Sequence, residues 1–341
     1  MRLYSLIKNI LSIDGRFLRT YIPLLYHLFL KLKYINKEDQ ELPGERKSFG
    51  YKHQDKTFFV IKMDNYGLGL LNYFNCVLGY VKFAKRKGYL PIVDMKNYPN
   101  TYLEKEEVGK INSWEYYFDQ PCNYTLDEVY ESKNVIISSG INTIEAGPSI
   151  LWFYYCLWWS KKRAREYDRI IGNQLKINRQ TQEVLDDNYC RILSGKRTIG
   201  VVKRGTDIIN CGGHSIQPEL SELIDRTKKM LTAWNCDYVF LATEEASTVK
   251  TFQEVFGDRL LINQSARVDH YSGGAIGDIS FNRTNDKYFR GLEYLTNVYL
   301  LAQCTCLIGS LVGSTTGALV LNKGRYENKY IYDLGTYPYN N

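Results

Sequence analysis

A regular alternation of apolar runs and helical patterns between residues 199 and 322 constrains the fold more than any other feature. Four apolar runs have the character of β-strands, and a stretch with apolar side chains at helical spacing follows each of them. The runs lie at 199–202, 237–243, 259–263 and 306–310, and the helical stretches at 220–234, 249–256, 287–303 and 314–322. Strict alternation predicts a parallel sheet covered on both faces, whose ligands bind at the carboxyl ends of the strands.

A strand–helix–strand unit precedes this series. An apolar run at 57–63 leads through the turn DNYGLG into a helical stretch at 70–88, and another run follows at 90–95. The 341 residues are enough for two α/β domains. We therefore expect an N-terminal helical segment and linker at 1–50, an N-terminal α/β domain at 51–190, a C-terminal Rossmann-like domain at 195–325 and a tail at 326–341.

Charge and cysteine usage exclude several classes of protein. The formal net charge of +7 is spread along the chain, without the basic stripe interleaved with aromatic residues that nucleic-acid binding requires. The eight cysteines and four histidines include no C-x-x-C pair and no metal-ligand spacing. We expect a reduced, cytoplasmic protein without a metal site.

The N-terminal segment raises the question of a membrane. Its longest apolar stretch, 21–30, is about half of the ~20 residues that a membrane span needs. Because Lys31 and Lys33 follow it, residues 3–33 are compatible with peripheral contact with the inner face of a membrane. Packing of this segment on the protein's own core is the competing interpretation, and we favour it.

The stretch IGVVKRGTD ends the first strand of the C-terminal series in a polar cluster. Arg204 would stand at a carboxyl end, where its guanidinium matches phosphate oxygens, whereas a structural arginine there would need a buried carboxylate. Gly205 lets the backbone approach a ligand closely, Thr206 can donate a hydrogen bond, and Asp207 can hold Arg204 or accept a proton. An ordinary polar turn would have the same composition.

Two other strand ends and one glycine turn strengthen the prediction. Glu244 and Glu245 follow the second strand, and Ser314 and Thr315 begin the last helix, where backbone amides and hydroxyls can hold an anion. A turn that needs small residues would look the same. In the N-terminal half, Gly67 and Gly69 could let a phosphate or sugar approach from the opposite side.

These stretches resemble the α-1,6-fucosyltransferase group and its bacterial relatives. IGVVKRGTD, GHSIQP, YVFLATEE, NRTNDKYFRGLEYL and CLIGS stand in the same order as in that group, and the likeness covers most of residues 57–322. The resemblance implies two Rossmann-like domains in a GT-B-like arrangement, with the acceptor on the N-terminal domain and the nucleotide on the C-terminal parallel sheet. It also implies a GDP-fucose donor and no metal or other cofactor.

Residue by residue, the resemblance is uneven. Arg204 matches the arginine that binds the donor's β-phosphate in the group, but the second arginine of the pattern is Gly205 here. His214 matches the histidine before the next helix. The aspartate that reads guanine is replaced by Asn297, and Glu293, four residues earlier on the same helical face, could take over that role. An amide has only one acceptor, so the identity of the nucleobase stays open.

The implied reaction is an inverting transfer of fucose to a surface glycan or its lipid-linked precursor. Such a displacement needs a base for the acceptor hydroxyl, for which Asp207 is the first candidate and Glu245 the second. For both carboxylates, capping or orienting a neighbour is an equally good interpretation. Two alternatives stay open: another nucleotide sugar on the same fold, and a catalytically silent sugar-nucleotide or glycan-binding module.

Overall fold

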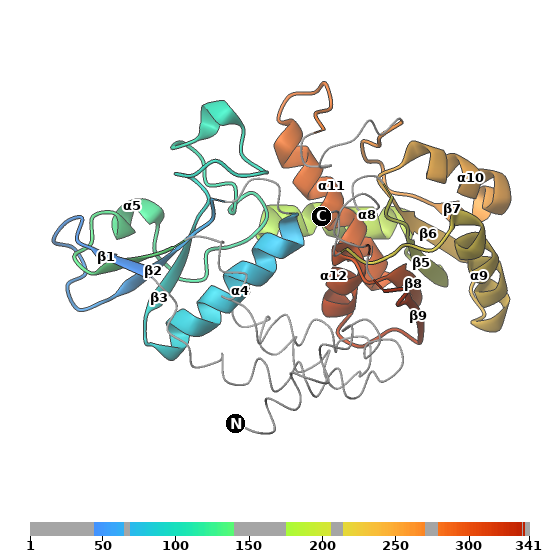
Figure 1. Cartoon of the computed structure of the whole chain (residues 1–341), viewed down its shortest axis with the longest axis horizontal. Helices are drawn as coiled ribbons and strands as arrows, with labels where there is room; N and C mark the ends of the chain where they lie inside the picture. The colour runs from blue at the N-terminus through green and yellow to red at the C-terminus, as the bar shows by residue number, and fades with distance from the viewer. Residues whose placement is uncertain are drawn as a thin grey trace.

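The computed structural model describes residues 44–64, 69–139, 175–205, 214–269, 279–335 and 337. Two β-sheets lie side by side in this part of the chain, with helices between and around them (Figure 1). The N-terminal sheet has four strands and the C-terminal sheet has five. The predicted α/β class is confirmed.

The C-terminal sheet is parallel throughout, with the strand order β7-β6-β5-β8-β9. Its strands are β5 (Thr198–Val202), β6 (Tyr238–Ala242), β7 (Leu260–Leu261), β8 (Cys306–Ser310) and β9 (Asn328–Tyr332). The expected tail after residue 325 therefore supplies an edge strand, and the boundary predicted there is too early. β9 pairs with β8 along its whole length, so the sheet needs residues up to at least Tyr332.

Helices cover both faces of this sheet, as the alternation predicts. They are α9 (Leu220–Ala233), α10 (Ala246–Phe256), α11 (Asp286–Gln303) and α12 (Gly313–Asn322), with a short 3-10 helix, η5, at Gly257–Arg259. Successive side chains of β5 point to opposite faces. Val201 packs in a cluster with residues of α9 and α10, whereas Val202 packs in a cluster with residues of α11 and α12.

The N-terminal sheet has the order β1-β4-β2-β3 and is mixed rather than parallel. Its strands are β1 (Gly44–Lys47), β2 (Phe58–Lys62), β3 (Leu90–Asp94) and β4 (Val135–Ser138). β1 runs antiparallel to β4 and lies within the stretch 1–50, which we expected to be a helical segment and linker. The domain boundary predicted at residue 51 is thus too late, because the first strand begins at Gly44.

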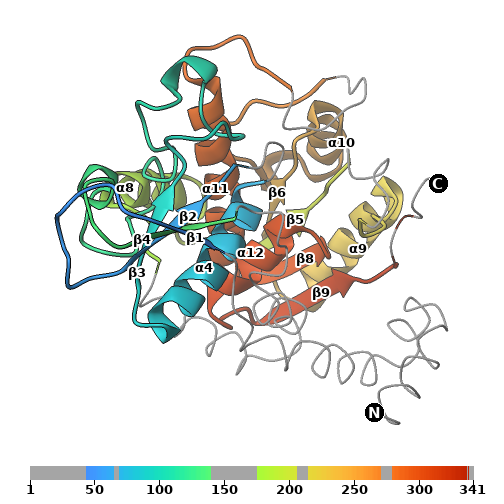
Figure 2. The same ribbon diagram turned by 60° about the vertical axis from the view of Figure 1, so that its left-hand side comes forward.

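The two sheets share one hydrophobic core. The 17-residue helix α4 (Leu70–Arg86) follows β2 in sequence, yet its first turn packs against α12 (Figure 2). At this contact a Cβ added to Gly317 would lie 2.1 Å from Leu71 and 2.9 Å from Val298. One cluster of buried side chains accordingly runs from Phe59 in β2 to Leu307 in β8.

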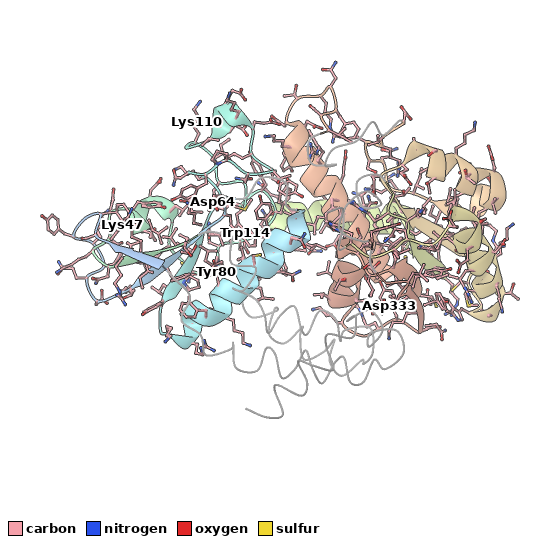
Figure 3. The ribbon with its side chains drawn as sticks, in the orientation of Figure 1. Lys47, Asp64, Tyr80, Lys110, Trp114 and Asp333 are labelled. Atoms are coloured by element: carbon pink, nitrogen blue, oxygen red, sulfur yellow. The ribbon has the colours of Figure 1, made fainter. Side chains whose placement is uncertain are left out.

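A second junction joins α11 to the loops of the N-terminal half. The Tyr117 hydroxyl donates to the backbone oxygen of Tyr288 over 2.8 Å, and Lys287 donates to the backbone oxygen of Leu103 over 2.8 Å. Trp114, labelled in Figure 3, and Tyr117 are buried, so both belong to the core. The remaining helices of the described ranges are η1 (Lys105–Glu107), α5 (Leu126–Val129) and α8 (Arg179–Ile192), the last of which packs on α11.

Candidate functional site

The order of the C-terminal strands reverses between β5 and β8. From β5 the chain moves outward to β6 and β7, then returns to the other side of β5 for β8 and β9. At such a reversal the loops that leave the two carboxyl ends diverge, and doubly wound sheets bind their ligands there. Arg204 follows β5 at this point, and α12 begins just after β8.

Arg204 is paired with a carboxylate. Its Nε lies 3.0 Å from Oε1 of Glu244 at the end of β6, and the side chains are 17% and 16% exposed. Asp207 was our sequence-based candidate to hold Arg204, but Asp207 and Thr206 lie outside the described residues. The acid that a structural arginine would need is therefore present, and an anion at this position has to share Arg204 with Glu244.

The next carboxylate, Glu245, lies over Gly205. A Cβ added to Gly205 would be 2.0 Å from the Oε1 atom of Glu245, so the carboxylate occupies the space that a side chain would take. The Thr248 hydroxyl donates to Glu245 Oε2 over 2.9 Å. Glu245 stands at the N-cap of α10 without a side-chain bond to the backbone there. Its carboxylate thus projects over the end of β5 instead of capping its own helix.

The first turn of α12 carries the hydroxyls that the sequence singled out. Ser314 is 8% exposed, and Thr315 is fully buried. Among the residues that the structure describes, the Thr315 hydroxyl has no hydrogen-bond partner. It lies next to β8, because a Cβ added to Gly309 would be 2.5 Å from it. A helix start with buried hydroxyls and free backbone amides provides an anion with donors.

One polar face of α11 was identified only in part from the sequence. Leu301 packs on Gly200 of β5, where an added Cβ would be 3.0 Å from its side chain. Asn297, Tyr294 and Arg290 precede Leu301 by 4, 7 and 11 residues in α11, which is the spacing of one helical face. This face therefore continues from the sheet past the carboxyl end of β5. The helical period was the signal that could have identified Tyr294 and Arg290.

Glu293 and Asn297, the two candidates for reading a base, differ in their surroundings. The Glu293 carboxylate accepts from both terminal nitrogens of Arg283 and from the Ala266 backbone N–H. By contrast, the buried Oδ1 atom of Asn297 has no hydrogen-bond partner among the described residues. The expectation that Glu293 replaces the missing aspartate is therefore disfavoured, since its carboxylate already holds two neighbouring segments together.

The N-terminal half contributes the start of α4. Gly69 is its N-cap, and a Cβ added there would meet nothing within 4 Å. Gly67 lies outside the described residues. Asp64 follows β2 and pairs with Lys62 over 2.7 Å. Figure 3 shows Asp64 on the side of the N-terminal sheet that faces the middle of the molecule. The contact between Leu71 and Gly317 places the start of α4 against the middle of α12.

The loop before α9 is fixed through its glutamine rather than its histidine. The Ser310 hydroxyl donates to Gln217 Oε1 over 2.5 Å, which ties this loop to the end of β8. His214 is exposed, and its backbone oxygen accepts from the Tyr337 N–H over 2.8 Å. The structure therefore provides no contact between the His214 side chain and the strand ends, among the residues that it describes.

The described ranges contain no group of three or more His, Cys, Asp and Glu side chains placed to hold a metal ion. None of the helices in these ranges combines the length and apolarity needed to cross a bilayer. The segment 3–33, predicted to contact a membrane or the core, lies outside the described residues.

Solved structures of fucosyltransferases are similar to this chain. The alpha-1,6-fucosyltransferase NodZ soaked with GDP-fucose is 17% identical, with coverage of 78% of this chain and 93% of that chain and a TM-score of 0.47. Selenomethionyl NodZ from Bradyrhizobium is 17% identical, with coverage of 82% and 96% and a TM-score of 0.48. POFUT1 in complex with GDP is 9% identical, with coverage of 81% and 99% and a TM-score of 0.47.

Sequence comparisons identify nothing further. No family model and no curated protein matches the chain. The NodZ structures come from the group that the sequence motifs resemble. At such low identities and TM-scores the likeness carries no argument about activity.

Proposed function

We propose that the protein is an inverting glycosyltransferase that moves fucose from GDP-fucose to a surface glycan or its lipid-linked precursor. One observation carries the proposal: Arg204 and the start of α12 flank the point where the strand order of the parallel sheet reverses. This is where such sheets bind nucleotides. The motifs that resemble the α-1,6-fucosyltransferase group include both elements, and they supply the choice of fucose.

The chemistry of the transfer fits these groups. A leaving diphosphate gains negative charge, which a guanidinium and the backbone N–H groups of a helix start stabilise without a metal. Arg204 would contact the diphosphate from one side, and the first turn of α12 would contact it from the other.

The acceptor hydroxyl needs a base. Asp207 and Glu245 remain our two candidates, and the surroundings of Glu245 support a role for it. Its carboxylate projects over the end of β5 beside Gly205, where no side chain intervenes. The Thr248 hydroxyl donates to Glu245 Oε2, which orients the carboxylate.

Recognition of the nucleobase is best assigned to Asn297. Its buried Oδ1, which has no partner among the residues that the structure describes, can accept from one edge donor of guanine, whereas Glu293 is engaged by Arg283 and Ala266. A single acceptor also suits other bases, so a glycosyltransferase with a different nucleotide sugar remains the alternative within this class.

Calorimetric titration of the full chain with GDP, UDP, CDP and ADP tests the proposal. GDP should bind with the highest affinity, and Arg204→Ala should weaken it by about tenfold or more, because a charge-assisted hydrogen bond is lost. Arg197→Ala is the matched control, since Arg197 pairs with Glu327 through both terminal nitrogens near the opposite ends of the strands. If no nucleoside diphosphate binds, the proposed function is wrong.

The ion pair between Arg204 and Glu244 favours one further candidate, a catalytically silent binding module. A guanidinium that is paired with a carboxylate can have a purely structural role. Incubation with GDP-fucose and glycan acceptors separates the two, because only the enzyme releases GDP. A protein that binds GDP-fucose but releases no GDP with any acceptor, or into water, would support the module.

A further inference from the structure

Tyr294 brings a phenol hydroxyl to the start of α12. It lies on the face of α11 that continues past the end of β5, four residues after Arg290 and three before Asn297. A Cβ added to Gly313, the first residue of α12, would lie 3.1 Å from the Tyr294 hydroxyl. A glycine at this position leaves room for the hydroxyl to approach the helix start.

The same hydroxyl bonds to Ser314. Burial raises the pKa of Tyr294 above its ordinary value, while the bond to Ser314 and the charge of Arg204 oppose the rise. The charge of Glu244 also acts on Tyr294. The phenol is therefore neutral at physiological pH, and it stands near both partners of the ion pair at the end of β5 and next to the hydroxyl of Ser314.

A second observation at this helix start points to a ligand site. Thr315 follows Ser314, is fully buried, and has a hydroxyl without a partner in the part of the chain that the structure describes. A buried hydroxyl of this kind loses its bonds to water without replacement, which costs free energy. Oxygen atoms of a bound anion would supply acceptors for such hydroxyls.

We propose that Tyr294 is a positioning residue of the donor site, which turns the Ser314 hydroxyl toward the diphosphate bound between Arg204 and the first turn of α12. The inference rests on the proposed function and deepens it. Two tyrosines of α11 define the contrast: the Tyr299 hydroxyl donates to Asp186 of α8 over 2.5 Å, a bond between helices, whereas Tyr294 serves the end of the sheet.

The test compares Tyr294→Phe with Tyr299→Phe in the full chain. Each variant removes one hydroxyl from the same helix and leaves the ring in place. We expect Tyr294→Phe to weaken GDP binding about tenfold in calorimetric titration, because the serine that it orients no longer favours the bound rotamer. Guanosine, which lacks the diphosphate, should bind both variants as it binds the unaltered protein, and Tyr299→Phe should bind GDP normally.

The outcomes separate the inference from the function on which it rests. If the unaltered protein binds no nucleoside diphosphate, the proposed function fails. If it binds GDP and Tyr294→Phe binds GDP equally well, or loses guanosine to the same extent, the inference is overturned while the function stands. Should Tyr294→Phe fail to fold, Gly313→Ala replaces it: the added methyl group displaces the hydroxyl and should give the same selective loss of GDP.

Discussion

The ion pair between Arg204 and Glu244 sets the charge at the end of β5. Together with Glu245, it places two carboxylates beside one guanidinium, in a site for which we propose an anionic ligand. The glycine at 205 is part of the same arrangement, because a second arginine there would need the space that the Glu245 carboxylate fills. The departure from the group's motif thus has a local structural cause.

Removal of one negative charge should strengthen anion binding. In Glu244→Gln the amide oxygen can still accept from Arg204, but the repulsion between carboxylate and diphosphate is gone. We expect GDP affinity in calorimetric titration to rise by a few-fold, about 0.5–1 kcal/mol for partly exposed charges. Glu327→Gln, which alters the pair with Arg197, should leave the affinity unchanged. Weaker GDP binding to Glu244→Gln would mean that its charge holds Arg204 in the productive orientation.

Gly205→Ala tests Glu245 as the base. The new methyl group would meet the carboxylate at 2.0 Å, so the end of this flexible side chain has to move. We expect a small change in melting temperature and a fall in transfer rate of about tenfold or more, since positioned bases contribute about 10²–10⁴. An unchanged rate of GDP release with GDP-fucose and acceptor would exclude Glu245 and leave Asp207.

At the scale of elements, strands and helices could largely be predicted from the sequence. The runs at 57–63, 90–95, 237–243 and 306–310 contain β2, β3, β6 and β8, because buried parallel strands are almost continuously apolar. β1 could not be predicted, since GERK is exposed and polar and is a strand only through its pairing with β4. β9 was missed because its burial is partial.

The site could be predicted less well than the elements. The strand ends identified Arg204, Glu245 and Ser314, because topology alone places carboxyl ends together. Their partners depend on side-chain packing in three dimensions, which no spacing encodes, so Glu244 was not assigned to Arg204. Tyr294 was passed over as one of 29 tyrosines, although its helical register with Asn297 placed it on the polar face.

The contact between α4 and α12 should be sensitive to one methyl group. In Gly317→Ala the added carbon would lie 2.1 Å from Leu71, inside a packed core. We expect the free energy of unfolding to fall by about 1–3 kcal/mol, the usual effect of overpacking. Gly69→Ala, where an added Cβ meets nothing within 4 Å, should be close to neutral in the same urea titration. Equal stability of the two variants would show that the helices shift apart freely.

At the scale of the whole molecule, buried phenols limit stability in alkali. Burial raises the pKa of Tyr117 and of Tyr326 well above the ordinary value of 10. Burial likewise raises the pKa of Tyr299, to about 12. Because the folded state binds these protons more tightly, the stability that they contribute is complete below pH 10 and is lost as the pH rises through the folded values.

We therefore expect the urea midpoint to fall steeply above pH 10, with tyrosinate absorbance appearing together with unfolding. Tyr117→Phe should reduce the slope of this fall, although it also costs about 1 kcal/mol at neutral pH through the lost bond to Tyr288. Tyrosinate that forms fully before unfolding would contradict the assignment, because it would show that these phenols reach solvent in the folded protein.

The glycine at 317 also determines how a ligand can leave. α4 and α12, one helix from each half, are in contact at this residue, and one cluster of buried apolar side chains continues from one sheet to the other. Rotation of one half away from the other would expose these buried apolar side chains to water. In the function that we propose, a donor would then enter and leave through local movements of side chains and loops, while α4 and α12 stay in contact.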